Sequence, residues 1–163
     1  MKKSNCFFYE QKVEYLGHII SPEGVATDSK MTTIIKEWLV PKSVKELRGF
    51  LGLAGYYQKF IRGFGIISKP LTELLKDSFK WNQRALKAFD QLKRALCQAH
   101  VVAMTNFQCA FVLETDACST RLGVVLSQEG RPLAFFSKAL GPRHQGFSIY
   151  KKEYSTILMA VDK

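Results

Sequence analysis

Two acidic residues in the second half of the chain have the surroundings expected of magnesium ligands. Asp116 follows a short apolar run with the length and composition of a buried strand. Glu153 lies in the segment IYKKEYSTILMAV, where Ile149, Ile157 and Ala160 recur near helical spacing. We expect Glu153 to share the inward face of this helix. An acid at a strand end and an inward acid on a helix supply the oxygen ligands that Mg²⁺ prefers.

The elements that would position these two acids are indicated by alternating side chains and turn signals. Strands are predicted at about 111–115, 122–128 and 133–137. The last two strands are joined through Glu129-Gly130, a typical hairpin turn. A final helix is predicted to begin near Ser148 and to run to Lys163.

The first half of the chain is predicted to begin with a β-hairpin and to continue as helices. Residues 6–20 are rich in strand-forming side chains, and a turn signal follows at 21–24. Asp28 has the type and position of an N-cap for the first helix. Ser43 and Glu46 form the S-x-x-E capping box that marks the start of a longer helix.

The longer helix carries three glycines, Gly49, Gly52 and Gly55, at positions that helices normally avoid. Each costs about 1 kcal/mol relative to alanine, so a close approach to the backbone must offset the loss. Tight packing against another helix and approach to a sugar-phosphate backbone both fit, and composition leaves the two explanations open. Four basic side chains nearby favour the second: Lys45, Arg48, Lys59 and Arg62.

The net charge of +10 is concentrated in the first hundred residues, which hold 17 Lys and Arg against 9 Asp and Glu. Such a module meets nucleic acid or an anionic membrane, although the same charge also fits a soluble surface. The four cysteines show neither zinc spacing nor a disulfide framework. No signal peptide is recognisable, and no apolar run approaches the roughly 20 residues of a membrane helix. We therefore expect no membrane partner and an intracellular location, in a cytoplasmic particle or the nucleus.

Seven sequence blocks, in the right order, resemble the polyprotein of gypsy-type long-terminal-repeat retrotransposons over essentially the whole chain. They are YLGHIISPEGVATD (15–28), PKSVKELRGFLGLAGYYQKFIRGF (41–64), PLTELLK (70–76), FKW (79–81), LETDA (113–117), GRPLAFFSKAL (130–140) and YKKEYSTILMAV (150–161).

The resemblance implies an α+β protein of three parts. Residues 1–27 would end a reverse-transcriptase palm with the primer-grip β-hairpin, and residues 28–78 would form the helical thumb. Residues 79–163 would be the truncated first part of a ribonuclease H-like α/β domain. The implied partners are a template-primer duplex or RNA–DNA hybrid and the remainder of the polyprotein.

The resemblance also assigns nucleic-acid-binding residues. In such proteins the hairpin would place the primer terminus through Leu16, Gly17 and His18. The glycine-bearing helix would lie along the minor groove, with Gly49, Gly52 and Tyr56 as its contact face and the four basic side chains named above beside it. A small-residue face suits the wide, shallow minor groove of an A-form duplex.

Asp116 and Glu153 would be catalytic carboxylates of the ribonuclease H-like domain, and would hold Mg²⁺ ions that activate a water and stabilise the leaving 3′-oxygen. The polymerase aspartates and the later carboxylates of the family are absent from this sequence. We therefore predict that this chain alone neither polymerises nor cleaves appreciably. A non-catalytic nucleic-acid-binding module and an inactive relic remain alternatives. The strand near Phe111 should also leave one edge unpaired and apolar surface uncovered.

Overall fold

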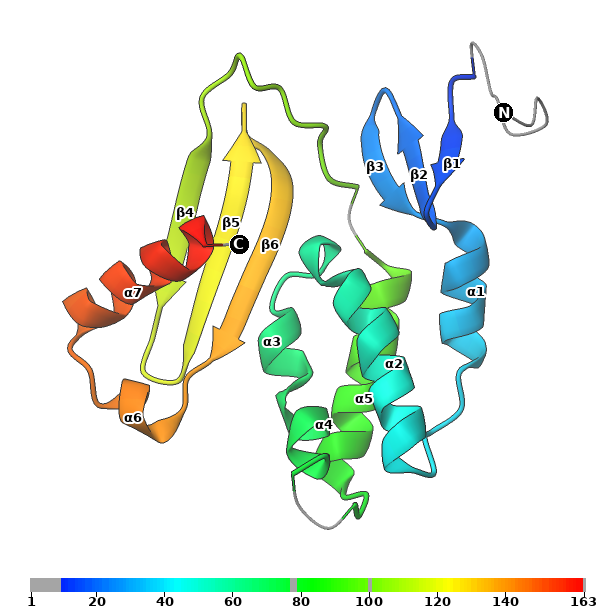
Figure 1. Cartoon of the computed structure of the whole chain (residues 1–163), viewed down its shortest axis with the longest axis vertical. Coiled ribbons are helices and arrows are strands. Elements are labelled where there is room, and N and C mark those ends of the chain that lie inside the picture. Colours follow the sequence, from blue (N-terminus) through cyan, green and yellow to red (C-terminus); the bar gives the residue numbers. More distant parts are fainter. Residues whose placement is uncertain (1–9, 77–78, 100, 163) are drawn as a thin grey trace.

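The computed structural model describes residues 10–76, 79–99 and 101–162, and Figure 1 shows three units side by side. A small three-stranded sheet comes first, a group of helices occupies the middle, and a second three-stranded sheet with a helix across it follows. This is the α+β class that the sequence predicts. No helix among the described residues is long and apolar enough to cross a membrane.

The first sheet is an antiparallel meander of β1 (Val13–Tyr15), β2 (His18–Ser21) and β3 (Gly24–Thr27). The predicted hairpin is confirmed for residues 10–20, while its residues 6–9 lie outside the described part. Leu16 and Gly17 connect β1 to β2 with φ angles of 50° and 75°. Two successive left-handed residues make the type I′ turn that matches the twist of the flanking strands.

Six helical segments form the middle unit. They are α1 (Ser29–Glu37), α2 (Val44–Tyr56), η2 (Gln58–Phe60), α3 (Phe64–Ile67), α4 (Lys69–Leu74) and α5 (Gln83–Cys97).

The starts of these helices are fixed by side-chain caps that the sequence predicts. Asp28 accepts a hydrogen bond from the Lys30 backbone N–H at 3.0 Å, which confirms the first N-cap. Ser43 Oγ accepts from the Glu46 N–H at 3.2 Å, as a capping box requires. The Glu46 carboxylate accepts from the N–H of Lys42, one residue before the N-cap, at 2.8 Å.

The main hydrophobic core joins α1, α2, η2, α4 and α5. Aromatic rings form its centre: the ring centroids of Phe50 and Phe89 are 4.7 Å apart, and Trp81 meets Phe89 at 5.9 Å. The Trp81 Nε1–H donates to the carbonyl of Pro41 at 2.7 Å, so the indole is both packed and hydrogen-bonded. This core holds α2 rigidly, with its opposite side free.

The second sheet consists of β4 (Val112–Ala117), β5 (Arg121–Gln128) and β6 (Arg131–Ala139), in that order and antiparallel. The predicted strands and the predicted Glu129-Gly130 turn are confirmed, and both turn residues have positive φ. The sheet order leaves β4 with one neighbour among the described strands, as expected for the strand near Phe111.

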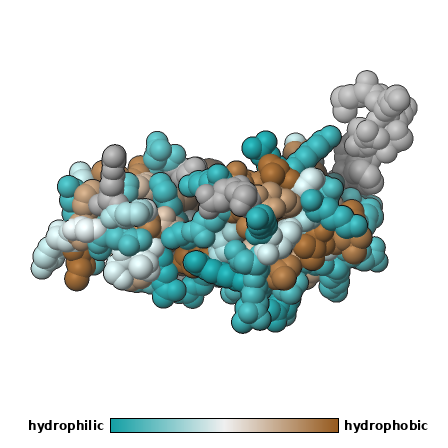
Figure 2. Space-filling model, turned by 90° about the horizontal axis from the view of Figure 1, so that it is seen from below, coloured by the Kyte–Doolittle hydropathy of each residue, from teal (hydrophilic) through white to brown (hydrophobic). Residues whose placement is uncertain are grey.

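Two helices follow the second sheet, the short α6 (Pro142–Gln145) and the longer α7 (Ile149–Val161), whose N-cap is the predicted Ser148. Helix α7 lies across β4 and β5 (Figure 1). The buried side chains of α7 are Lys152 and Thr156, 7% and 0% exposed. In Figure 2, hydrophobic groups are interspersed among hydrophilic ones on the side of the molecule seen from below.

The expected inward face of the last helix is wrong. Ile149 and Ile157 are 66% and 44% exposed, and Glu153 is exposed with them. Apolar residues occur all around this helix, so their spacing did not identify the buried side. Its exposed apolar surface agrees with the prediction of uncovered apolar area.

Candidate nucleic-acid interface

A stripe of exposed residues runs along α2 on the side away from the core. Lys45, Gly49, Gly52 and Tyr56 are spaced by three or four residues, so they lie above one another on one helix face. All four are exposed. We call this set the glycine stripe.

The structure separates the two explanations for the glycines of α2. A Cβ atom built on Gly49, Gly52 or Gly55 would meet nothing within 4 Å in the described part of the chain. Close packing against another helix of this unit is therefore not the reason for them. The backbone of α2 is bare at the stripe, and an external surface can approach it closely.

Basic side chains flank this bare backbone. Lys45 belongs to the stripe itself, and Arg48 is exposed one residue before Gly49. Lys59 and Arg62 follow the end of α2 and are also exposed. Exposed positive charges near a small-residue face would hold a phosphate backbone against it.

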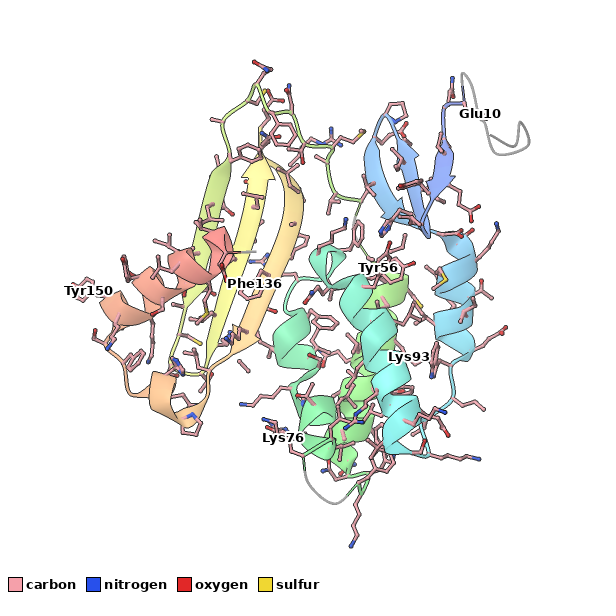
Figure 3. All side chains as sticks on the ribbon, in the orientation of Figure 1. Glu10, Tyr56, Lys76, Lys93, Phe136 and Tyr150 are labelled. Atoms are coloured by element: carbon pink, nitrogen blue, oxygen red, sulfur yellow. The ribbon has the colours of Figure 1, made fainter. Side chains whose placement is uncertain are left out.

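The glycine stripe continues into the β1–β2 turn through two tyrosine hydroxyls. Tyr56 Oη donates to the Leu16 carbonyl at 2.9 Å, and Tyr57 Oη donates to the Gly17 carbonyl at 3.1 Å. Figure 3 shows Tyr56 at the end of α2 that faces the first sheet. The structure thus brings together the turn and α2, which the sequence assigns separately.

His18 lies behind this contact as a buried ring, 9% exposed. Its imidazole stacks on Tyr56, with ring centroids 5.2 Å apart and planes at 12°, and meets Tyr57 edge-on at 5.4 Å. Burial lowers the pKa of His18, and the positive charge of Lys59 lowers it further. The ring is therefore a neutral packing element, whereas the exposed Leu16 forms the tip of the turn.

Asp116 and Glu153 project from different parts of the second sheet unit. Residues paired across antiparallel strands share a face, so Asp116, Gly123 and Ser137 point to the same side. Leu122 and Val124 point to the other side, where α7 lies and where they are buried. The sheet therefore separates Asp116 from α7, the helix that carries Glu153.

The surroundings of Asp116 contain as many cations as anions. It lines a cavity of about 390 Å³ together with Glu114, Arg62 and Arg121. No group of three or more His, Cys, Asp or Glu side chains suited to a metal occurs within residues 10–76, 79–99 and 101–162. Asp116 lies on β4 and Glu153 on α7, and their assignment as magnesium ligands stays a prediction.

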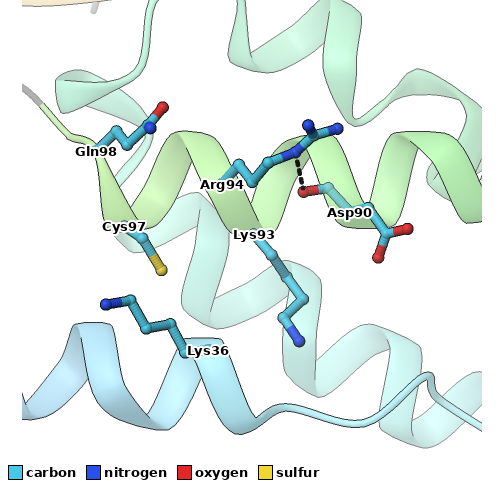
Figure 4. A pocket seen from close by; sticks show the side chains of 6 residues that line it. All are labelled: Lys36, Asp90, Lys93, Arg94, Cys97 and Gln98. Carbon is cyan, nitrogen blue, oxygen red and sulfur yellow. Dashed lines mark hydrogen bonds between the residues drawn. The ribbon is translucent and has the colours of Figure 1, made fainter.

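A groove with three basic side chains lies between α1 and α5 (Figure 4). The sequence alone did not identify it. It has a volume of about 700 Å³ and is lined by Lys36, Asp90, Lys93, Arg94, Cys97 and Gln98. Lys93 Nζ is already bound to the Trp38 carbonyl at 2.7 Å. The groove is lined by side chains of α1 and α5, whereas the glycine stripe lies on α2.

Comparison with known proteins gives consistent matches. The family described as the RNase H-like domain found in reverse transcriptase matches residues 81–163. The retrovirus-related Pol polyprotein from transposon 297 of Drosophila melanogaster is 36% identical over 163 residues, covering 98% of this chain and 15% of that protein. An uncharacterized mitochondrial protein of Arabidopsis thaliana is 44% identical over 113 residues, covering 68% of this chain and 72% of that protein.

Solved structures show the same fold. The foamy viral protease-reverse transcriptase in complex with RNA/DNA hybrid superposes with a TM-score of 0.87 at 23% identity, covering 93% of this chain and 21% of that chain. The same viral protein in complex with dsDNA gives 0.88, covering 94% and 34%.

The chain spans only a small part of the length of its transposon relatives. It spans 15% of the transposon 297 polyprotein and 16% of the gypsy polyprotein, to which it is 34% identical. These relatives are Pol polyproteins, and the ribonuclease H-like match over residues 81–163 includes α5 and the second sheet unit. The chain belongs to the Pol polyproteins of gypsy-type retrotransposons, and covers the region of the reverse-transcriptase thumb and the ribonuclease H-like domain.

Proposed function

We propose that this chain grips a template-primer duplex or RNA–DNA hybrid as part of a retrotransposon reverse transcriptase. The glycine stripe and the Leu16-Gly17 turn form the contact surface, and the stripe would enter the minor groove. The observation that carries the proposal is the empty space at Gly49 and Gly52. Two helix-interior glycines cost about 2 kcal/mol together, and no described protein atom uses the room that they leave.

The charge around the stripe supports the same partner. Lys45 and Arg48 lie on α2, Lys59 and Arg62 follow its end, and all four are exposed. Each contact with a phosphate releases a counterion. Four such contacts give a slope of about −3 to −4 in log affinity against log salt. The structural neighbours in complex with RNA/DNA hybrid and dsDNA support this class of ligand for the shared fold.

The first test compares two exposed arginines on different helices, Arg48 of α2 and Arg94 of α5. Binding of a labelled RNA–DNA hybrid is measured over a salt series for the wild type, Arg48→Ala and Arg94→Ala. We expect Arg48→Ala to weaken binding and to reduce the salt slope by about 1. Arg94, in the groove of Figure 4, is the matched control and should leave both unchanged. Equal losses for the two variants would reject the stripe as the specific contact.

The second test separates stability from binding at one residue. Gly52→Ala places a methyl group in open space and should raise the free energy of unfolding by about 0.5–1 kcal/mol. The same methyl group should hinder the close approach of a duplex and weaken hybrid binding. Gln91→Ala, at an exposed position of α5, should leave hybrid binding unchanged. A Gly52→Ala protein that is stabilised and binds as tightly as the wild type would contradict the proposal.

The two carboxylates enter the proposal in a limited role. We propose that Asp116 and Glu153 bind Mg²⁺ only in a longer polyprotein, whose other segments bring the two carboxylates together and contribute the remaining ligands. Their separation by the second sheet favours a binding role for this chain over cleavage. Asp116→Asn should therefore leave hybrid binding unchanged. Mg²⁺-dependent cleavage of the hybrid by the wild-type chain would contradict this assignment.

A further inference from the structure

We infer that Tyr57 is a positioning residue that fastens the Leu16-Gly17 turn to the thumb helix, so that the hairpin and α2 act as one gripping element. The inference rests on the proposed function and extends it to a buried residue outside the glycine stripe. We call the contact of Tyr56 and Tyr57 with the turn the tyrosine clasp.

The turn needs an external support because its conformation is strained. Leu16 has a φ of 50°, a left-handed conformation that costs a residue with a Cβ roughly 1–2 kcal/mol. Its side chain is 69% exposed, so burial does not offset this cost. Strained residues of this kind persist when their surroundings over-determine them, and they concentrate at functional sites.

Three hydrogen bonds over-determine this turn. The Leu16 carbonyl accepts from Tyr56 Oη, and the Gly17 carbonyl accepts from Tyr57 Oη. The Gly17 carbonyl also accepts from the backbone N–H of Asp28, the N-cap of α1, at 3.2 Å. The turn is thereby tied at the same point to the start of α1 and the end of α2.

Tyr57 also explains why residue 17 is glycine. A Cβ atom on Gly17 would lie 2.6 Å from Tyr57 Oη, while the next atoms, Tyr57 Cζ and Met31 Cγ, are 3.9 Å away. The hydroxyl thus approaches the turn as closely as only glycine permits. Tyr57 is 1% exposed, and burial raises the pKa of its hydroxyl, so the group remains protonated and able to donate.

His18 fills the space behind the clasp. Its ring contacts Tyr56, Tyr57 and Phe60 at centroid distances of 5.2 to 5.4 Å. Its Nδ1 is buried and has no hydrogen-bond partner among the described residues. The imidazole therefore packs against both tyrosines in the manner of an apolar ring, while the tyrosine rings also meet edge to face at 5.0 Å.

The functional consequence is a fixed spacing between two contact points. Leu16 at the tip of the turn and Gly52 on the stripe are 36 residues apart in sequence. The clasp nevertheless connects their two segments directly. A duplex would therefore meet both at once, and loosening the clasp would weaken binding without removing a phosphate contact.

The test is a double-mutant cycle on the full chain, with Gly17→Ala, Tyr57→Phe and the double variant. Tyr57→Phe keeps the ring and removes one hydrogen bond, so hybrid affinity should fall about three- to tenfold with the salt slope unchanged. Gly17→Ala should fall further, because its methyl group meets the hydroxyl. In the double variant the obstructing oxygen is gone, so the loss should be smaller than the product of the single losses.

Circular dichroism and titration of the active fraction show that each variant is folded. Amide hydrogen exchange of residues 13–21, measured without nucleic acid, shows directly whether the clasp still stabilises the hairpin. Faster exchange together with the non-additive affinities supports the inference. Strictly multiplicative losses would overturn it, as would a Tyr57→Phe protein with wild-type affinity. If Arg48→Ala also binds normally, the proposed function itself fails, and the positioning role fails with it.

Discussion

Helices α2 and α7 are each thirteen residues long and each begins at a capping serine, yet they are packed in opposite ways. Helix α2 buries Leu47, Phe50 and Ala54 in the main core and exposes glycine and basic side chains. Helix α7 buries Lys152 and Thr156 and exposes most of its large apolar residues. The main core lies wholly in the helical unit, apart from Val102, and none of its buried members comes from the second sheet or α7.

This difference shows which part of the chain holds its exposed surface in a fixed position. A helix held by a continuous core keeps its exposed face fixed, so a bare backbone there is available to a ligand. A helix with apolar residues toward solvent has surface suited to covering by other polypeptide. We therefore expect the helical unit with its hairpin to be the stable binding part, and the second sheet unit to open more readily.

The largest expected effect comes from truncating the centre of the helical core. Phe50→Ala removes a ring that is fully buried against Phe89, and should lower the free energy of unfolding by about 3–5 kcal/mol. Phe107→Ala is the control, because Phe107 is 83% exposed and its loss should cost less than about 0.5 kcal/mol. Denaturant unfolding measures both. Similar losses of unfolding free energy at the two positions would contradict the conclusion that the helical core stabilises the chain.

A matched pair of caps compares the two helices directly. Ser43 Oγ accepts from Glu46 N–H at 3.2 Å, and Ser148 Oγ accepts from Lys151 N–H at 3.4 Å. Ser43→Ala should reduce global stability by about 1 kcal/mol, since α2 belongs to the main core. Ser148→Ala should mainly speed amide exchange within α7 and the β4–β5 strands. A larger loss of global unfolding free energy for Ser148→Ala than for Ser43→Ala would show that α7, and not α2, belongs to the more stable part.

Acid should loosen the helical unit through His18. The pKa of His18 is lowered in the folded chain from 6.5, so below pH 6.5 the unfolded chain takes up the proton more readily. This contribution to stability is complete above pH 6.5 and is lost as the pH falls toward the lowered folded value. The faces of the ring meet Tyr56, Tyr57 and Phe60, and Lys59 is the charged neighbour.

The pH effect can be isolated with one substitution. Unfolding free energies at several pH values between 5 and 7.5 are compared for the wild type and His18→Phe, which keeps an aromatic ring without the titrating nitrogen. The wild type should lose more stability than the variant over this range. Parallel profiles would show that His18 does not titrate differently in the folded and unfolded chains.

The smallest expected effect is on the exposed side of α7. Tyr150→Ser changes a side chain that is 84% exposed, and should alter the free energy of unfolding by less than about 0.5 kcal/mol. A loss of more than 1 kcal/mol would mean that this face is packed, and the contrast with α2 would disappear.

Local features of the fold were predictable because their causes are local. Asp28, Ser43 and Asn82 cap helices through hydrogen bonds to residues two or three positions away, and the Glu129-Gly130 turn follows from its residue types. The residues of the glycine stripe were predicted through the family resemblance. Only the structure showed that the space above the glycines is empty.

Long-range features were not predictable in the same way. Tyr57 meets Gly17 across forty residues of sequence, and nothing in the tyrosine pair itself indicates which hydroxyl reaches which carbonyl. The face of α7 was misjudged because apolar spacing surrounds the helix, while the buried positions are a lysine and a threonine. Lys152 is tolerated there because its ammonium donates to the Gln145 carbonyl at 2.7 Å.

The bare backbone at Gly49 and Gly52 has one more consequence, for the choice of template. Helical N–H and C=O groups are engaged within the helix, and glycine has no side chain with which to distinguish one base edge from another. A contact surface of this kind does not distinguish one base sequence from another. We therefore expect the proposed contact surface to bind duplexes of different base sequence with equal affinity.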